Sequence, residues 1–316
     1  MSDSGSSGRT LAPAPPTVPG DVIDAHTHLF TVGLLEEMVS KMPNVPERFK
    51  DGLRKRKWGK RADVLPDKPP FETAQWYVER LHAAGVSKAL VMSIAPDNQW
   101  TRDFLVAANG HVHALCGIDP RDPGAPALLE REVAAGFRGV KLLPSNRCYR
   151  LSDPACRPLF EKVAELGVAV TIHYGVTVDP TGDMRYADPT DLSPVARDFP
   201  DTKFVIAHFG AGYLQEVLRV AYQCKNVCVD TSGTNNWMDY YVPRLALSDV
   251  FERALTALGP ERVLFGTDAG TTAAYRTWIK FEQMRTMEEL GLSEDDLDLV
   301  RRGNAVRIFR LDDPLR

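Results

Sequence analysis

From residue 21 onward, short runs of β-branched and apolar residues alternate with longer amphipathic stretches. Eight short runs are predicted to be strands: Asp21–His28, Lys88–Ser93, His111–Asp119, Phe137–Leu142, Val168–His173, Lys203–His208, Val227–Asp230 and Val263–Asp268. Helices are predicted at Glu72–Ala84, Ala127–Ala135, Pro158–Leu166, Tyr213–Gln223 and Val250–Leu258, most of them closed by a glycine. This alternation indicates βαβ units around a parallel sheet, and eight strands predict a closed (β/α)8 TIM barrel of the α/β class.

Two segments depart from the repeating pattern. Residues 1–20 are mostly Ser, Gly, Ala and Pro with almost nothing to bury, so we expect a disordered leader before a single barrel domain at 21–316. His28 and Ser93, which end the first two strands, are 65 residues apart, whereas later strand ends are 22 to 38 apart. The extra residues, at about 31–70, are predicted to form a cap-like insertion above the barrel mouth.

The insertion contains a strongly basic stretch. ERFKDGLRKRKWGKR, at 47–61, carries eight basic residues and two acidic ones. Such a stretch is typical of a solvated basic helix. A charged gate for an anionic substrate and a contact with a partner subunit remain open alternatives.

Composition and charge exclude several classes of protein. With 44% hydrophobic residues the chain can bury a substantial core. Its 38 basic against 42 acidic residues give a net charge of -4, which supplies no general attraction for nucleic acid or an anionic membrane. The five cysteines form no CxxC pair, and neither a signal peptide nor a membrane span is apparent. We therefore expect a cytoplasmic protein that acts on a small molecule.

Polar side chains stand at the carboxyl ends of the predicted strands, where a packed core would not place them. These are His26, His28, Lys141, His173, His208 and Asp268. In a (β/α)8 barrel this end is the catalytic face, and residues from several strands converge there. Since side chains alternate along a strand, His26 and His28 are predicted to point to one side, with Ala25 and Thr27 on the other.

This pattern suits a metal ion. A catalytic zinc usually takes three protein ligands and keeps a position open for water or substrate. His173 and Asp268 each end an apolar strand, so together with the first pair they form a set of three histidines and one aspartate. His111 and His113 also have HxH spacing, but they begin a strand, and we assign them a structural role.

Several motifs resemble those of a known family. They are DAHTHLF at 24–30, GVKLLP at 139–144, TIHYG at 171–175, FVIAHFG at 204–210, NVCVDTSG at 226–233, LFGTDAG at 264–270 and NAVRIFRL at 304–311. Together they resemble the amidohydrolase superfamily of metal-dependent barrels, and most closely its amidohydrolase-2 branch, which includes relatives of aminocarboxymuconate semialdehyde decarboxylase. The resemblance spans residues 21–311 and is more specific for fold and metal site than for substrate.

The resemblance implies roles for the strand-end residues. His26, His28, His173 and Asp268 would hold a divalent ion, zinc or alternatively manganese, which lowers the pKa of water. Asp268 would take a proton from that water and pass it to the leaving group, and His208 would stabilise negative charge or act as a second acid or base.

Lys141 is ambiguous under the resemblance. In two-metal members a carboxylated lysine at this position bridges the ions, whereas GxKLxP segments of the similar branch accompany one ion and an unmodified lysine that could pair with a substrate carboxylate. We favour one ion. The family pattern often has His where this chain has Leu143, which leaves the substrate further in doubt.

Candidate substrate contacts follow the strands on predicted loops. They are Asn98, Trp100, Arg147, Arg150, Tyr174, Arg185 and Trp237. Arginine binds carboxylates and aromatic rings line flat ligands, so a small carboxylated or cyclic substrate is predicted.

Two reactions suit this constellation. The first is hydrolysis of an amide, lactone or ester, and the alternative is non-oxidative decarboxylation of an unsaturated or aromatic acid. A non-catalytic barrel would have a broken ligand set, whereas all four ligands are present here. Nucleophilic serine or nucleotide-binding motifs are absent from the sequence. A homodimer is only a family expectation.

Overall fold

The computed structural model describes residues 22–29, 33, 36, 39–40, 42, 45–58, 68–93, 99–177, 179, 181–233, 236–270 and 275–312. The predicted leader at 1–20 therefore lies outside the described residues, as does much of the predicted insertion at 31–70.

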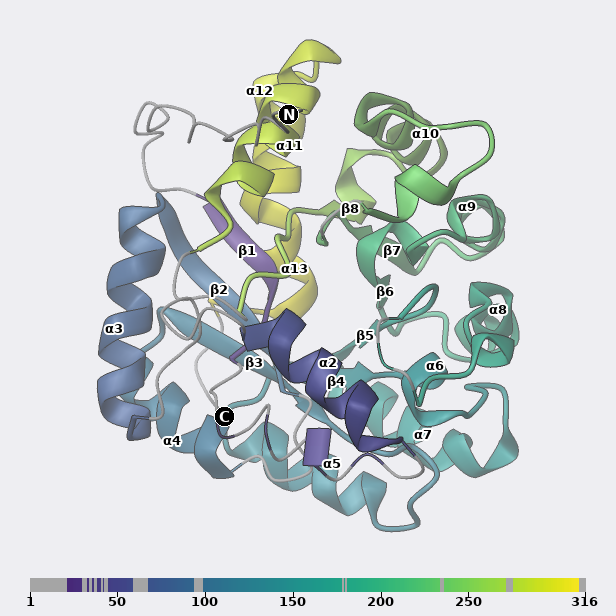
Figure 1. Ribbon diagram of the computed structural model, residues 1–316. Helices are drawn as coiled ribbons and strands as arrows, with labels where there is room; N and C mark the ends of the chain where they lie inside the picture. Colours follow the sequence, from purple (N-terminus) through teal and green to yellow (C-terminus); the bar gives the residue numbers. More distant parts are fainter. Residues whose placement is uncertain are drawn as a thin grey trace, which may run out of the picture.

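Eight parallel strands form one sheet in sequence order (Figure 1). They are β1 (Val22–Thr27), β2 (Val86–Met92), β3 (Val112–Gly117), β4 (Gly139–Leu142), β5 (Ala169–Ile172), β6 (Phe204–Ile206), β7 (Val227–Asp230) and β8 (Val263–Leu264). Beyond the β8 ladder, the amide of Ala25 donates to Phe265 O at 2.9 Å and that of His28 to Ala269 O at 2.6 Å. These bonds join the last strand to the first, so the predicted (β/α)8 barrel is confirmed.

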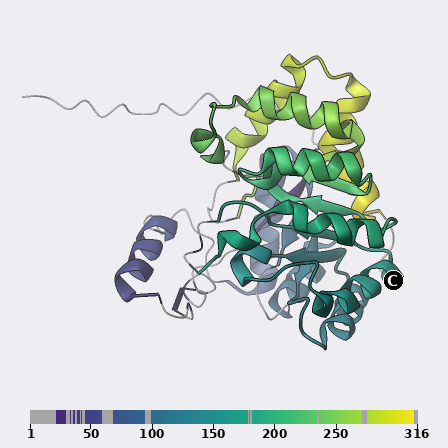
Figure 2. The ribbon, with the colours of Figure 1, turned by 90° about the vertical axis from the view of Figure 1, so that its right-hand side faces the viewer.

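The described helices surround the sheet, apart from α2, which lies away from it (Figures 1 and 2). They are α2 (Glu47–Trp58), α3 (Pro70–Ala83), α4 (Gln99–Ala108), α5 (Ala125–Ala134), α6 (Pro144–Arg147), α7 (Arg157–Leu166), α8 (Leu192–Asp198), α9 (Leu214–Gln223), α10 (Leu247–Leu258), α11 (Thr277–Glu289), α12 (Glu294–Asp298) and α13 (Asn304–Phe309). Short 3-10 turns lie at Pro154–Cys156, Met184–Tyr186, Pro189–Asp191, Ala207–Gly210, Asn236–Tyr240 and Pro260–Arg262, and a π-helical turn at Leu299–Gly303. Each predicted helix is present, with bounds that differ by up to three residues.

Alternate side chains of the strands pack into two different hydrophobic cores. In β2, Ala89 and Val91 pack in the larger core, which includes residues of the surrounding helices, while Leu90 and Met92 pack in a smaller one with residues from other strands. The smaller core fills the barrel and includes Phe309 of α13. Strands buried on both faces explain the continuous apolar runs of the sequence.

A register shift in β1 changes the predicted alternation. The pairing of β1 with β2 shifts between Asp24 and Thr27. Ala25 packs in the core that fills the barrel, while the next residue, His26, also faces inward toward Lys141. The prediction that Ala25 points away from His26 is therefore wrong, because a bulge places two consecutive side chains on the same side.

Candidate metal centre

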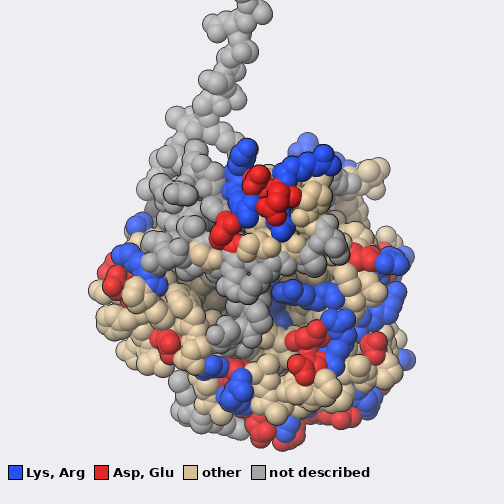
Figure 3. All heavy atoms as spheres, turned by 60° about the horizontal axis from the view of Figure 1, so that its bottom comes forward, with Lys and Arg blue, Asp and Glu red and all other residues tan. Residues whose placement is uncertain are grey.

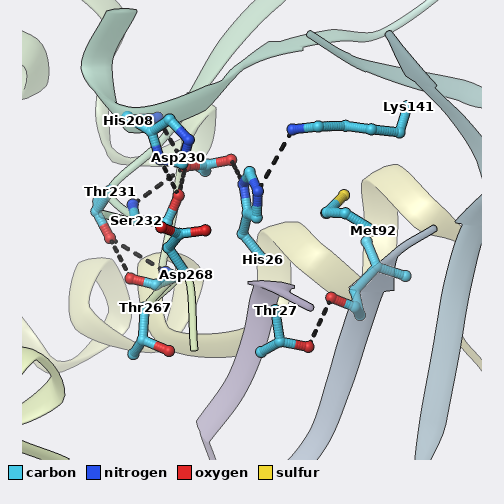
Figure 4. A network of polar contacts seen from close by, with 12 residues as sticks. His26, Thr27, Met92, Lys141, His208, Asp230, Thr231, Ser232, Thr267 and Asp268 are labelled. Atoms are coloured by element: carbon cyan, nitrogen blue, oxygen red, sulfur yellow. Dashed lines mark hydrogen bonds and ion pairs between the residues drawn. The ribbon is translucent and has the colours of Figure 1, made fainter. Parts of the chain in front are cut away.

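Three donor side chains from separate parts of the chain meet at the carboxyl end of the barrel (Figure 4). Each of His26, His208 and Asp268 offers one ligand atom, and these atoms lie within 4.8 Å of one another. His26 belongs to β1, His208 follows β6 and Asp268 follows β8. Both histidines are buried, whereas Asp268 is about a quarter exposed. The convergence therefore brings together two of the four predicted ligands and the predicted acid or base His208.

His26 is held by a carboxylate on one side. Its Nδ1 lies 2.7 Å from Oδ2 of Asp230, and its Nε2 lies 3.3 Å from Nζ of Lys141. Since an ionised carboxylate only accepts, Nδ1 of His26 carries the proton and Nε2 presents its lone pair. Burial, and secondarily the Lys141 charge, lower the pKa of His26 to about 3, so the imidazole is neutral at pH 7.

The surroundings of His28 favour a cation beside it. Its Nδ1 lies 3.3 Å from the backbone carbonyl of Met92, and its Nε2 lies 3.1 Å from Oδ1 of Asp268. Both partners are acceptors, but a neutral imidazole has only one N–H. A second proton or a cation at Nε2 resolves this conflict, and a divalent ion bound by both groups is one such solution.

Asp268 is ionised in this setting. Burial by itself would raise its pKa, but the hydrogen bond from His28 and the neighbouring imidazoles outweigh burial and hold the pKa well below the usual range. A guanidinium nitrogen of Arg276 also lies 3.4 Å from Oδ2. The carboxylate is thus available as a ligand or as a proton acceptor.

His208 and Asp268 have unusual backbone conformations. Their φ angles are +58° and +56°, in the left-handed region that non-glycine residues rarely adopt. β6 ends at Ile206 and β8 at Leu264, both short of the predicted ends. Strain of this kind is concentrated at functional sites, where the surrounding fold enforces it.

His173 carries an unused donor. Its Nε2 is buried and has no hydrogen-bond partner within the described part of the chain. Its ring centroid lies 5.1 Å from that of His208. Burial, reinforced by the charges of His208 and Lys141, lowers its pKa well below the usual value, which keeps the imidazole neutral. A buried nitrogen without a partner is costly, and a metal ligand role would satisfy it. The donors present therefore fit a divalent ion.

Lys141 lies inside the barrel at β4. It is 2% exposed, and burial lowers its pKa to about 8, against the opposing influence of Asp230 and Asp268. The ammonium form therefore still predominates at pH 7. Its position beside His26 suits both alternatives raised by the sequence, an unmodified lysine and a carboxylated bridge between two ions.

Four residues of the network were not predicted as site residues. Asp24 accepts hydrogen bonds from the His26 amide at 3.0 Å, the Thr267 hydroxyl at 2.5 Å and the Tyr275 hydroxyl. Asp230 and Arg276 contact His26 and Asp268 as described, and the fourth residue is Ser232 (Figure 4). Asp230 ends β7 and Ser232 lies in the NVCVDTSG motif, so both positions carried a signal, whereas nothing in the sequence marks Arg276.

The predicted substrate contacts are found in varied settings. Asn98 lies outside the described residues. Trp100 stacks on Phe104, with ring centroids 5.5 Å apart, and Trp237 is buried. Tyr174 is also buried, and its hydroxyl has no partner among the residues the structure describes.

The predicted arginines lie toward the surface. Arg147, in α6, and Arg150 are exposed, and the guanidinium of Arg150 lies 5.8 Å from the Tyr186 ring centroid. Arg185 is 81% exposed and pairs with Asp183 at 2.5 Å. A role in substrate binding stays a prediction for all three arginines, and Arg185 already forms an ion pair with Asp183.

The basic helix α2 stands off from the barrel (Figure 2). Part of its charge is neutralised locally, because Arg54 pairs with Glu36 at 2.9 Å and with Asp51 at 2.9 Å. Acidic and basic side chains are interleaved on the face shown in Figure 3. These pairs agree with a solvated helix.

Similarity to known proteins assigns the chain to a family. The sequence profile described as amidohydrolase matches residues 23–311. The chain belongs to the amidohydrolase family. Members of its amidohydrolase-2 branch are metal-dependent hydrolases or decarboxylases. A dihydroorotase of Ralstonia pickettii (strain 12J) is 28% identical to this amidohydrolase over 176 residues, which cover 51% of the chain and 44% of the relative. The chain thus spans less than half of that curated relative.

Solved structures share the barrel of this amidohydrolase. A putative 2-pyrone-4,6-dicarboxylic acid hydrolase from Pseudomonas putida has a TM-score of 0.63 and 20% identity, covering 94% of this chain and 100% of that one. The 5-carboxyvanillate decarboxylase of Novosphingobium aromaticivorans, complexed with manganese, has a TM-score of 0.61 and 15% identity, with coverage of 92% and 96%. A zinc-bound amidohydrolase of Burkholderia multivorans has a TM-score of 0.60 and 18% identity, covering 92% of this chain and 99% of that one. At these identities the likeness establishes the fold.

Membrane spans were also considered for this amidohydrolase. Across the described ranges, no helix combines the length and apolar character that crossing a membrane requires.

Proposed function

We propose that this chain is a metal-dependent hydrolase that uses one divalent ion to cleave an amide, lactone or ester of a small carboxylated or cyclic substrate. His26, His28, His173 and Asp268 would hold the ion, with His208 beside it. The observation that carries the proposal is the convergence of His26, His208 and Asp268 within 4.8 Å. The buried, unpartnered Nε2 of His173 adds support.

Zinc is the ion we propose, because imidazole nitrogens and carboxylate oxygens are both ligands that zinc takes in catalytic sites. Zinc and manganese are bound in the Burkholderia and Novosphingobium structures, respectively. When bound, such an ion acts as a Lewis acid that lowers the pKa of water and polarises a carbonyl.

The protein's own groups supply the proton transfers. Asp268 is ionised and can accept a proton from an attacking water and return it to the leaving group. The Lys141 ammonium, buried beside His26, can pair with a carboxylate or with negative charge that develops on the substrate. Arg276, next to Asp268, is a further cation for the same purpose.

Metal analysis tests the proposal. We expect one ion per chain by mass spectrometry, lost from His26→Gln and retained by His113→Gln, a histidine at the opposite end of the barrel. A chain that retains no divalent ion after loading and gel filtration would refute it. Two tightly held ions, with hydrolytic activity restored by bicarbonate, would instead establish the carboxylated Lys141 alternative.

The substrate class needs a separate test. A panel of small lactones, esters and amides that carry a carboxylate should include a substrate for the zinc-loaded chain. For that substrate, Arg147→Ala should raise KM without removing metal, because it removes a carboxylate contact at the rim. An unchanged KM would count against a role for Arg147.

Decarboxylation is the second candidate, and the buried Lys141 ammonium favours it. A cation in the site is suited to hold the carboxylate of an unsaturated or aromatic acid. The Novosphingobium structure shows that this fold carries out such chemistry in a relative. Release of CO2 from a candidate acid, rather than release of an alcohol or amine, would establish this reading.

We infer three further properties. A cytoplasmic location is supported by the five cysteines, all of which are free. A cap formed by the insertion is supported by the position of α2 beyond the barrel (Figure 2). A homodimer remains a family expectation that size-exclusion chromatography with light scattering would test.

A further inference from the structure

One serine links the two imidazoles of the candidate centre to a single carboxylate. Oγ of Ser232 lies 2.7 Å from Nδ1 of His208 and in closer contact with Oδ1 of Asp230. The other oxygen of Asp230 lies 2.7 Å from Nδ1 of His26. Asp230 and Ser232 are fully buried, so no bulk water competes for these contacts (Figure 4).

The backbone decides where each proton lies. Oδ1 of Asp230 accepts the amide of His208 at 2.9 Å and that of Ser232 at 3.1 Å. This oxygen is therefore an acceptor, and the close contact with Oγ of Ser232 requires the hydroxyl proton between them. Since a hydroxyl has one proton, Oγ cannot also donate to His208. Nδ1 of His208 must then carry a proton and donate it to Ser232.

We propose that Asp230 and Ser232 are positioning residues that fix His26 and His208 as Nδ1–H tautomers, so that both Nε2 lone pairs face the candidate metal site. This inference rests on the proposed function for its purpose, although not for its geometry. A neutral His208 then accepts a proton or a ligand bond at Nε2 and does not donate from it. Of the roles that the sequence left open for His208, a base is therefore favoured over an acid and over a group that stabilises negative charge, since both of these would need a proton on Nε2.

The surrounding turn leaves little room for another partner of Nδ1. Gly233 has a φ of +108°, and a Cβ added there would lie 3.3 Å from Nδ1 of His208. The chain thus passes close to the ring on the side where Ser232 accepts. This close approach explains why a glycine follows the serine.

Nitrogen NMR of the full, uniformly labelled chain tests the assignment. We would record long-range 1H–15N spectra at pH 8, above the ordinary imidazole pKa of about 6.5, with and without zinc. Each imidazole would be assigned by a histidine-to-glutamine variant. In the native chain, Nδ1 of His26 and of His208 should bear the proton in both states. An Nε2–H signal from the metal-free His208 would overturn the proposal without any need for a mutant.

Variants then separate the two positioning residues. Ser232→Ala should shift His208 toward the Nε2–H tautomer and leave His26 unchanged, whereas Ser232→Thr should restore the native pattern. Ser193→Ala, which removes an exposed hydroxyl bonded to Gln223, is the matched control and should change neither ring. An unchanged His208 tautomer in Ser232→Ala would refute the role of the serine. Absence of zinc binding with intact Nδ1–H tautomers would instead refute the proposed function and leave the positioning network standing.

Discussion

A single methyl group added at Gly270 should damage both stability and the candidate centre. Gly270 has a φ of +143°, and a Cβ built there would lie 1.9 Å from the carbonyl oxygen of His28 and 2.7 Å from its Cα. The atoms in conflict are backbone, so no side chain can rotate away. Relief to a contact of about 3 Å requires a shift of about 1 Å at His28 or Gly270.

The energetic cost has two parts. A strained φ for a side-chain residue costs about 1–3 kcal/mol, and forced overpacking costs about 1–3 kcal/mol more. We therefore expect Gly270→Ala to destabilise the fold by about 2–6 kcal/mol. At about 2 °C per kcal/mol for a chain of this size, the unfolding temperature should fall by about 4–12 °C.

Two matched glycine variants separate the conformational cost of a side chain at positive φ from the steric cost of the close contact. Gly110 has a φ of +81° but nothing within 4 Å of its added Cβ, so Gly110→Ala measures the conformational cost alone. Gly52, in helix α2, has neither a positive φ nor a close neighbour, and Gly52→Ala should be neutral or slightly stabilising.

Calorimetric unfolding and zinc titration provide the readouts. Gly270→Ala should be less stable than Gly110→Ala and should also bind zinc more weakly, because the shift displaces His28. Equal stability of these two variants, with native zinc affinity, would refute the claim that close backbone approach at Gly270 positions His28.

Three further variants test other parts of the account. Asp230→Asn should weaken zinc binding about 10- to 100-fold, because it removes the acceptor that orients His26, while the surface control Asp198→Asn should leave zinc binding unchanged. Native affinity in Asp230→Asn would contradict this. His113→Gln should lose less stability in acid than the native chain. Burial lowers the pKa of His113 to about 4, so the native free energy of unfolding should be unaffected by this group above pH 6.5 and should fall by about 3 kcal/mol between pH 6.5 and 4. Urea titrations at each pH would measure this loss in the two proteins. If the free energy of unfolding of the native chain and of His113→Gln changed equally with pH, a contribution of His113 to acid sensitivity would be excluded. Arg262→Met should cost about 2–4 kcal/mol, because the guanidinium donates to four backbone carbonyls in a buried setting, and a change in urea midpoint below the experimental error would refute that.

The fold could be predicted from the sequence because parallel strands that are buried on both faces consist of continuous apolar runs. The prediction for β7, Val227–Asp230, matches to the residue. The prediction for the last strand, Val263–Asp268, extends four residues too far. The ladder with β7 stops there because the next amide, that of Phe265, donates to the carbonyl of Val300 outside the sheet, a contact that hydrophobic patterning does not encode.

The candidate site was only partly accessible. Strand-end position was sufficient to select His26, His208 and Asp268, since the barrel brings those ends together. Asp230 also ends its strand, but strand-end position could not reveal its role or that of Ser232, because both act through hydrogen bonds between β7 and two other elements. Trp100 was predicted to lie on a loop and to contact substrate, but it lies in the first turn of helix α4 and its ring stacks on Phe104.

The most direct measurement is an anomalous difference map, recorded at the zinc edge from crystals of the zinc-loaded chain. The account predicts one peak, about 2.0–2.2 Å from a nitrogen of each of His26, His28 and His173 and from an oxygen of Asp268. The absence of a peak at these side chains would contradict it, as would a second peak bridged by a modified Lys141.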